Sequence, residues 1–426
     1  MRYQTLQEWL AWLESCHPVE IDLGLARISA VAKTLKLDFA NVPVITVGGT
    51  NGKGSCVAIL NAVLRAAGYR VGCFTSPHFI RYNERIVVND RVASDSQLIE
   101  SFDRIDRARG DLSLTYFEFN ALAAFDIFEH ADLDVVILEV GLGGRLDAVN
   151  TLDADIGIVT SIALDHQDWL GDDLAAIGQE KAGIYRRNKP ALCGDEKAPE
   201  TVAAYANKIG AEFYQAGTHF STESHKGSWS WSGYDGNGAS VTLNHLPVSD
   251  LPEASLAVAI QALQFLSLPI PETAYQAMGK IVLTGRFQRV TLGESEVILD
   301  VAHNPAAAEH LSKKLAEYPV SGKTYAIFAT MADKDVEGVV SALANSIDHW
   351  LVCSIADNAR ALSLESLVET IKKLSSKCCE EFSAPGQAFF QIKDRLQAGD
   401  RLLVFGSFFT VAGVLSELSK QELIHE

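Results

Sequence analysis

The sequence predicts an α/β protein of two domains, the first of which carries a phosphate-binding loop. The chain has 426 residues, more than one hydrophobic core usually organises, so two domains are expected. From Val44 onward, short β-rich runs alternate with helical patterns, the order of a parallel sheet with helices on both faces. The stretch "GGTNGKGS" at 48–55 lies between such a run and a helical pattern. We therefore expect an N-terminal P-loop-type parallel-sheet domain and a smaller C-terminal Rossmann-like α/β domain.

The first domain is expected to cover residues 1–284. Its predicted strands are the apolar runs at 42–47, 69–76, 133–140 and 156–162, and a helix is predicted at 55–68. The region 217–250 is rich in Gly, Ser and Trp, which favours a small antiparallel patch at the end of this domain.

The second domain is expected to cover residues 285–426, because a second alternation of strands and helices starts there. Strands are predicted at 296–302, 324–331, 349–355 and 401–407, and helices at 306–318, 336–347 and 411–420.

Composition excludes several classes of protein. The formal charge of −18 disfavours a nucleic-acid partner, since such proteins present a basic face to the phosphate backbone. No apolar run is long enough to span a membrane, and no secretory signal is apparent. The seven cysteines form no CxxC pair and read as reduced, buried thiols. We expect a cytoplasmic monomer.

The loop at 48–55 is suited to bind phosphate. Its backbone N–H groups and the start of the following helix attract anions, and Lys53 supplies a positive charge. The usual phosphate loop has Ser or Thr directly after Gly-Lys as a magnesium ligand, but here Gly54 takes that place. The alternative is a Gly-rich turn without a ligand.

The missing metal ligand is expected at the carboxyl ends of neighbouring strands, where open α/β sheets bind ligands. Ser76, Glu139 and His166 follow or end three predicted strands. Glu139 is the strongest of the three, because a carboxylate at the end of a buried apolar strand is costly unless it is paired or metal-bound. Taken alone, Ser76 is a turn hydroxyl before Pro77, and His166 is a surface or hydrogen-bonded histidine.

Two further loops carry charge near the predicted site. The stretch "SPHFIRYNERI" places Arg81 and Arg85 where an anionic substrate could meet them, although such loops are usually solvated. The Gly-rich stretch "EVGLGGRLDAVN" carries Arg145 and Asp147; it lacks GxGxxG, so a dinucleotide site is not expected.

The second domain offers its own candidates. In "ILDVAHNP", Asp300, His303 and Asn304 follow the first strand, with an Asx turn before proline as the alternative reading. In the first domain, Lys181 of "GQEKAGI" has by itself the pattern of a solvated helix lysine.

Seven motifs, in this order, resemble the bacterial folylpolyglutamate synthases, which belong to the Mur-type ATP-dependent amide ligases. They are "GTNGKGS", "SPHFIRYNERI", "EVGLGGRLDAVN", "LDHQDWLG", "EKAGI", "TGRFQ" and "DVAHNP". The resemblance runs from "IDLGLARI" to "FGSFFTVAG". It is closest to the bifunctional dihydrofolate synthase/folylpolyglutamate synthase type, because "DLSLTYFEF" and "IDLGL" are similar to that type's dihydropteroate-binding segments.

The resemblance implies two magnesium ions beside the nucleotide. Ser76 and Glu139 would hold the first, and Glu139, His166 and a carbamylated Lys181 the second. Carbamylation converts a cation into an anion, which suits a residue beside a metal.

The resemblance also assigns the substrate contacts. ATP is expected to contact Asn51, Gly52, Lys53, Gly54, Arg286 and Asp300, with His303 near the reacting groups. The pteroate pocket is expected to be lined by Ile21, Asp22, Leu23, Thr115, Tyr116, Phe117, Glu118, Leu146, Asp147 and Ala148.

Three positions depart from the family pattern. Ser255 stands where the family usually has a nucleotide-contacting Asn, which weakens any expectation of adenine recognition there. Thr284 replaces a usual Pro, and Phe409 replaces a frequent His. Both changes are expected to affect the orientation of the domains and not the chemistry.

The implied reaction is acyl activation. A substrate carboxylate attacks the γ-phosphate of ATP, and L-glutamate then displaces phosphate to form an amide. The acceptors would be dihydropteroate and reduced folates, with a synthase acting only on reduced folates as the alternative. A common phosphate-loop GTPase would need Gly-Lys-Ser/Thr, and a non-catalytic nucleotide- or folate-binding regulator would leave Ser76, Glu139, His166 and Lys181 unexplained.

Overall fold

The computed structural model describes residues 1–19, 21–356 and 358–421. The chain divides into two compact units, Met1–Ile281 and Val282–Glu426, which are described separately. No described helix combines the length and the apolar character needed to cross a membrane.

The first unit is built on an eight-stranded sheet in the order β4-β3-β2-β5-β1-β6-β7-β8. Its strands are β1 (Val44–Gly48), β2 (Val71–Phe74), β3 (Ile86–Val88), β4 (Arg91–Val92), β5 (Val135–Glu139), β6 (Ile156–Val159), β7 (Pro190–Cys193) and β8 (Glu212–Gln215). Neighbouring strands from β2 to β8 in this order are parallel, whereas the pairs β2–β3 and β3–β4 at one edge are antiparallel. Strands β1 and β5 lie at the centre, and every residue in them is buried.

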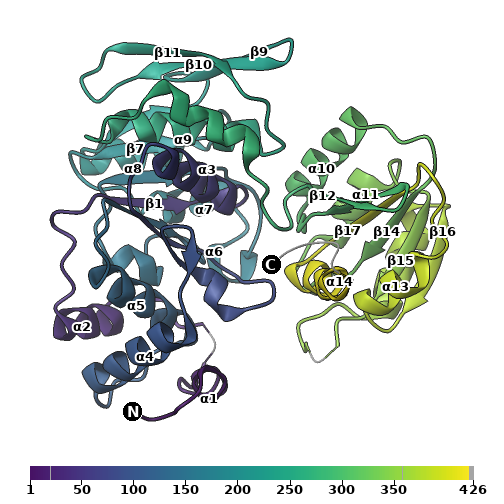
Figure 1. Cartoon of the computed structure of the whole chain (residues 1–426), viewed down its shortest axis with the longest axis horizontal. Helices are drawn as coiled ribbons and strands as arrows, with labels where there is room; N and C mark the ends of the chain where they lie inside the picture. The colour runs from purple at the N-terminus through teal and green to yellow at the C-terminus, as the bar shows by residue number, and fades with distance from the viewer. Residues whose placement is uncertain (20, 357, 422–426) are drawn as a thin grey trace. The chain divides into compact units, whose positions relative to one another are not determined.

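Helices cover both faces of this sheet (Figure 1). They are α1 (Leu6–Leu13), α2 (Ala26–Leu35), α3 (Lys53–Ala66), α4 (Asp95–Arg109), α5 (Tyr116–Glu129), α6 (Gln167–Leu170), α7 (Leu174–Ala182), α8 (Glu200–Ile209) and α9 (Glu253–Phe265), with 3-10 turns η1 (Tyr82–Arg85), η2 (Ala148–Thr151) and η3 (Glu272–Lys280). Helix α5 is buried along most of its length, because its sequence is apolar on nearly every side.

The predicted antiparallel patch is a separate three-stranded sheet, which is drawn beside α9 in Figure 1. It consists of β9 (Ser221–His225), β10 (Ser228–Tyr234) and β11 (Ser240–Leu246), with β10 in the middle. Trp231 of β10 is fully buried, and its indole N–H donates to the carbonyl of Ala257 in α9 at 3.1 Å. This indole therefore fixes the small sheet to helix α9 of the same unit.

The second unit is a six-stranded sheet in the order β12-β13-β17-β14-β15-β16. The strands are β12 (Gln288–Leu292), β13 (Ser295–Leu299), β14 (Thr324–Phe328), β15 (His349–Cys353), β16 (Cys378–Phe382) and β17 (Arg401–Phe405), and the helices are α10 (Pro305–Glu317), α11 (Val336–Leu343), α12 (Leu364–Leu374), α13 (Pro385–Ile392) and α14 (Phe408–Lys420). All pairs except β12 with β13 are parallel. The predicted α/β class and the parallel core of both units are confirmed; β12, α12, β16 and α13 were not predicted.

The prediction that all cysteines are buried thiols is wrong in part. Cys56, Cys73, Cys193 and Cys353 are buried free thiols, as expected, because they lie in central strands or against them. Cys378 is exposed, since it opens β16 at the edge of the second sheet.

Candidate functional site

The loop between β1 and α3 has a backbone shape that only glycine accommodates. Gly49 and Gly52 have φ angles of 135° and 86°, in the left-handed region that other residues avoid. A Cβ atom on Gly49 would lie 2.0 Å from Thr160 Oγ1, and one on Gly52 would lie 2.6 Å from Ser255 Oγ. The segments that carry Thr160 and Ser255 therefore lie too close to the loop for any residue with a Cβ atom at these two positions.

Hydroxyl groups after β6, which the sequence analysis did not single out, fix the loop. Thr160 Oγ1 donates to the carbonyl of Asn51 at 2.7 Å. Ser161 Oγ lies 3.0 Å from the same carbonyl and accepts the Asn51 N–H at 3.0 Å. The signal was present in the sequence, since two hydroxyl residues end the strand next to the loop strand.

The buried side of the loop meets two lysines. Lys53 Nζ donates to the carbonyls of Gly49 and Thr50 at 3.1 and 3.2 Å, and Lys181 Nζ donates to the Gly49 carbonyl at 3.1 Å. The solvated position expected for Lys181 from its local sequence is wrong, because only 4% of its surface is exposed. Burial, followed by the charge of Lys53, lowers the pKa of Lys181 to about 7.

Two of the predicted metal ligands lie together at the carboxyl end of the sheet. The backbone N–H of Ser76, after β2, donates to Glu139 Oε2, at the end of β5, at 3.1 Å. Glu139 is 4% exposed, as expected of a carboxylate at the end of a buried strand. The adjacency of β2 and β5 in the sheet brings these residues together.

His166 follows β6 and precedes α6. Its φ is 53°, an uncommon value for a residue with a side chain. The backbone N–H of His166 donates to Asp165 Oδ1 at 2.9 Å, and Asp165 is buried. The buried aspartate helps to hold His166 in this left-handed conformation.

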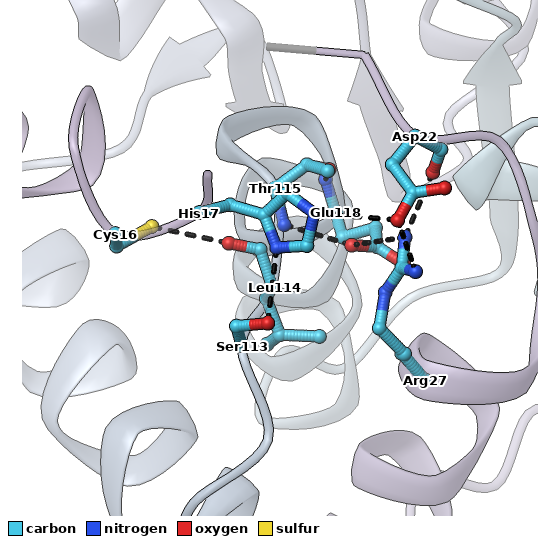
Figure 2. Close-up of polar contacts among 8 residues, drawn as sticks. All are labelled: Cys16, His17, Asp22, Arg27, Ser113, Leu114, Thr115 and Glu118. Carbon is cyan, nitrogen blue, oxygen red and sulfur yellow. Dashed lines mark hydrogen bonds and ion pairs between the residues drawn. The ribbon is translucent and has the colours of Figure 1, made fainter. Parts of the chain in front are cut away.

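Two of the three predicted pteroate segments, through Asp22 and Glu118, meet at Arg27, which lies at the start of α2 (Figure 2). Arg27 Nη1 donates to Asp22 Oδ2 at 2.5 Å, and Nη2 donates to the Asp22 carbonyl at 2.8 Å. The same Nη2 lies 3.3 Å from Glu118 Oε1 and donates to Oε2 at 3.4 Å. One guanidinium therefore connects two carboxylates that are far apart in the sequence.

Glu118 is held a second time at the start of α5. The Thr115 N–H donates to Glu118 Oε2 at 2.8 Å, and the Glu118 N–H donates to Thr115 Oγ1 at 3.2 Å, which is a capping box. Figure 2 also shows His17 between Ser113 and Asp22, with ring nitrogens 3.1 Å from Ser113 Oγ and 3.3 Å from Asp22 Oδ2. His17 and Arg27 were not predicted: His17 lies outside the motifs, and Arg27, within "IDLGLARI", has no local signal of its contacts to Asp22 and Glu118.

The backbone of the Gly-rich loop after β5 forms hydrogen bonds to the side chain of Asp147. Its carboxylate accepts the N–H groups of Gly141, Leu142 and Val149 at 3.0, 2.8 and 3.0 Å. Burial raises the pKa of Asp147 to about 6, although these hydrogen bonds oppose the shift. Asp147 thus shapes the loop itself, a role the sequence did not indicate.

The other predicted pocket residues lie around this loop. The ring of Phe117 in α5 approaches Gly141 so closely that a Cβ atom there would be 2.5 Å from it. Turn η2, which begins at Ala148, packs against both α5 and α2. Tyr116 is partly buried, as are Ile21, Leu23 and Leu146.

Arg81 and Arg85 have different environments despite their proximity in sequence. Arg81 is exposed, whereas Arg85 is buried, donates from Nε to His78 Nδ1 at 2.9 Å, and lies 5.8 Å from the ring centroids of Tyr82 and Tyr116. Burial and then the charge of Arg85 lower the pKa of His78 to about 4. The general expectation that such loop arginines are solvated is therefore wrong for Arg85.

The candidates of the second unit lie at the carboxyl end of β13. Asp300 accepts the N–H groups of Phe287 and Ala302, both at 2.8 Å. The guanidinium of Arg286 lies 5.2 Å from the ring centroid of Phe408, and His303 Nδ1 is 2.8 Å from the carbonyl of Val301. Asn304 caps α10 by accepting the Ala307 N–H at 3.0 Å, which is a helix N-cap three residues on rather than the Asx turn given as the alternative.

Comparison with known proteins identifies the family. Residues 285–408 match the family model "Mur ligase, glutamate ligase domain". The chain is 43% identical over 411 residues to the dihydrofolate synthase/folylpolyglutamate synthase of Escherichia coli, covering 96% of this chain and 94% of that protein. The chain belongs to the dihydrofolate synthase/folylpolyglutamate synthase family.

Other members of the dihydrofolate synthase/folylpolyglutamate synthase family agree. The Haemophilus influenzae protein is 39% identical and covers 96% of each chain. The structure of E. coli FolC in complex with DHPP and ADP has a TM-score of 0.92 at 41% identity, covering 98% of this chain and 99% of that one. A bifunctional enzyme solved with Mn, AMPPNP and L-glutamate has a TM-score of 0.89 at 40% identity, covering 98% of both. The predicted family, fold class and ligase class are confirmed.

Proposed function

We propose that this ligase uses ATP to join L-glutamate to dihydropteroate, forming dihydrofolate, and to reduced folates, forming folylpolyglutamates. The observation that carries the proposal is the convergence of Lys53, Lys181 and a glycine loop at the end of the central strand, beside Glu139. The names of the relatives, which describe both activities at up to 43% identity, support the same reaction.

The chemistry follows from the charges at the loop. The acceptor carboxylate attacks the γ-phosphate of ATP, the bond from the γ-phosphorus to the bridging oxygen breaks, and ADP leaves as the acyl phosphate forms. Lys53 and the loop N–H groups stabilise the negative charge that develops on the phosphate oxygens. The amine of L-glutamate then attacks the acyl carbon, and the C–O bond to phosphate breaks as the amide forms. Asn51, Gly52 and Gly54 provide the rest of the loop surface.

The donor set around Glu139 fits divalent cations. Magnesium prefers oxygen ligands and keeps contacts to phosphate, and Glu139 and Ser76 supply oxygens at adjacent strand ends. Glu139 and Ser76 would hold one ion, and Glu139, His166 and a modified Lys181 a second, which when bound would neutralise phosphate charge.

We propose that Lys181 is carbamylated in the active enzyme. A buried ammonium group beside Lys53 would repel a metal ion, whereas a carbamate in the same place carries negative charge and offers oxygen ligands. Its burial beside the phosphate-binding loop supports this assignment.

The roles of Arg286, Asp300 and His303 toward the nucleotide stay predictions, as does the lining of the pteroate pocket by Ile21–Leu23, Thr115–Glu118 and Leu146–Ala148. Arg27 supports the second of these, because it joins Asp22 to Glu118.

The test is to incubate the purified chain with ATP, magnesium, labelled glutamate and one acceptor at a time. Labelled amide should form with dihydropteroate and with tetrahydrofolate, and should need ATP. Product from tetrahydrofolate alone would make the enzyme a monofunctional folylpolyglutamate synthase. No product from any acceptor would overturn the proposal.

A further inference from the structure

Three side chains with metal-binding atoms lie side by side at one edge of the second unit's sheet. In the parallel strands β14, β15 and β16, Tyr325 is in register with His349, and His349 with Cys378. Glu380 lies two residues after Cys378 on the same strand, so both side chains are on the same face. The strands stand next to each other in Figure 1.

The geometry brings the possible ligand atoms close together. A ring nitrogen of His349, the sulfur of Cys378 and a carboxylate oxygen of Glu380 all lie within 4.8 Å of one another, and no other such trio occurs among the described residues. The ring of His349 stacks on Tyr325, with centroids 4.8 Å apart and planes at 20°. This stacking restricts the imidazole.

One ring nitrogen of His349 lacks a hydrogen-bond partner in the described part of the chain. His349 Nδ1 is buried and has no hydrogen bond within residues 1–19, 21–356 and 358–421. Buried polar atoms nearly always have a partner, because an unsatisfied one costs about 1–3 kcal/mol. A ligand contacting the imidazole could remove that cost, by coordinating the nitrogen or by fixing the ring where its nitrogens are satisfied.

Glu380 is already oriented. Arg395 donates to both of its oxygens, at 2.7 and 2.8 Å. A carboxylate has about four lone-pair positions, so two stay available when Arg395 is bound. Metal-binding carboxylates commonly carry such a second hydrogen-bond partner.

We propose that His349, Cys378 and Glu380 form a zinc site. Imidazole nitrogen, thiolate sulfur and carboxylate oxygen are the three ligand types that Zn²⁺ accepts together, whereas magnesium and calcium prefer oxygen alone. Ligand atoms around tetrahedral zinc lie roughly 3.5 Å apart, so the side chains need to close by about 1 Å. A water molecule would complete the fourth position.

The site is separate from the residues assigned to the ligase reaction in this unit. His349 and Cys378 are the first residues of β15 and β16, whereas Asp300 and His303 follow the carboxyl end of β13. Strands β13, β17, β14, β15 and β16 are all parallel. Residues that begin β15 and β16 therefore lie at the opposite end of the strands from residues that follow β13. Zinc would cross-link the edge strand β16 to β15 and stabilise this unit without taking part in catalysis.

Cobalt is the best probe, because tetrahedral Co²⁺ bound to a thiolate has a charge-transfer band in the near ultraviolet. Reduced, metal-free full-length protein should develop this band with one equivalent of Co²⁺, and Zn²⁺ should abolish it by displacement. The magnesium ligands proposed for the first unit include no cysteine, so cobalt bound there gives no such band.

Matched variants identify the ligands. Cys378→Ser should remove the band, and His349→Gln or Glu380→Gln should weaken cobalt binding by at least the roughly 10–100-fold that loss of a ligand's hydrogen-bond partner causes. Cys379→Ser is the control, because its side chain lies on the opposite face of β16; it should keep the band. Zinc should raise the unfolding temperature of the wild type and of Cys379→Ser but not of Cys378→Ser. No band in the wild type, a band that survives Cys378→Ser, or one lost equally in Cys379→Ser would overturn the proposal.

Discussion

Lys53 and Lys181, from two different helices, donate hydrogen bonds to the same oxygen, the carbonyl of Gly49, each at 3.1 Å. Two ammonium groups at this separation repel one another, and burial of Lys181 adds a desolvation cost to its charged form. These two causes, burial first, lower its pKa to about 7. Only the neutral amine reacts with carbon dioxide, so a lowered pKa at Lys181 is what the proposed carbamylation requires.

Replacing Lys53 by Ala should lower kcat for amide formation by about 100-fold or more, because the phosphate loses its main side-chain counter-ion in the transition state. Steady-state kinetics with saturating ATP would measure it. Lys226→Ala, at an exposed position in the turn between β9 and β10, is the matched control and should leave kcat unchanged. A folded Lys53→Ala protein with near-normal turnover would contradict this role.

Lys181→Ala should lose most activity and regain part of it when a short carboxylic acid such as acetate is added, because the free anion can replace the carbamate. The same acid should activate neither the wild type nor Lys53→Ala. With ¹³C-labelled bicarbonate, the active wild type should show a carbamate resonance that Lys181→Ala lacks. A fully active wild type without that resonance would exclude the modification.

The loop and the strand-end residues were predictable from sequence because each depends on local pattern. An apolar strand, a glycine turn and a helix occur within 20 residues or so of each other, and parallel strands bring their carboxyl ends to one edge of the sheet. Ser76 and Glu139 illustrate this, since their contact follows from the adjacency of β2 and β5.

Contacts across long stretches of chain were not predictable in the same way. Lys181 meets Gly49 across 132 residues, and Arg27 meets Glu118 across 91. Their local sequences are those of ordinary surface helices, so nothing nearby signals burial. Strand β16 was missed for a related reason: as an edge strand its sequence "CCEEF" is interrupted by two glutamates and lacks the apolar run of a central strand.

Replacing Arg27 by Gln should raise KM for the pteroate acceptor about tenfold and leave KM for ATP unchanged, because Asp22 and Glu118 lose the group that fixes both. Glu118 is 4% and Arg27 25% exposed at the side chain, so loss of the pair should also lower the free energy of unfolding by about 1–3 kcal/mol, less than for a fully buried pair. Kinetics with each substrate varied, together with urea denaturation, would measure both effects.

Arg27→Lys tests whether the position of the charge matters, and Arg107→Gln is the control for stability. Arg27→Lys keeps the charge but cannot contact both carboxylates at once, so it should recover little of the acceptor affinity. Arg107→Gln removes a 71% exposed partner of Asp103 and should change stability by less than about 0.5 kcal/mol. If Arg27→Gln raised both KM values equally, the contact would be structural only.

The pH dependence of stability should carry a contribution from Asp147. Its folded pKa of about 6 lies above the ordinary value of 3.8 for aspartate, so the folded state binds the proton more tightly than the unfolded state does. The resulting stabilisation is fully present below about pH 4 and is lost as pH rises through about 6, with a size on the order of 3 kcal/mol.

Asp147→Asn removes the titration, so the wild type should lose stability relative to this variant between pH 4 and pH 7. Groups common to both proteins cancel in that difference, which urea denaturation at each pH would measure. Asp111→Asn, at an exposed position, should show no such trend. A difference between wild type and Asp147→Asn that stays constant from pH 4 to pH 7 would mean that the three backbone N–H groups keep Asp147 ionised throughout.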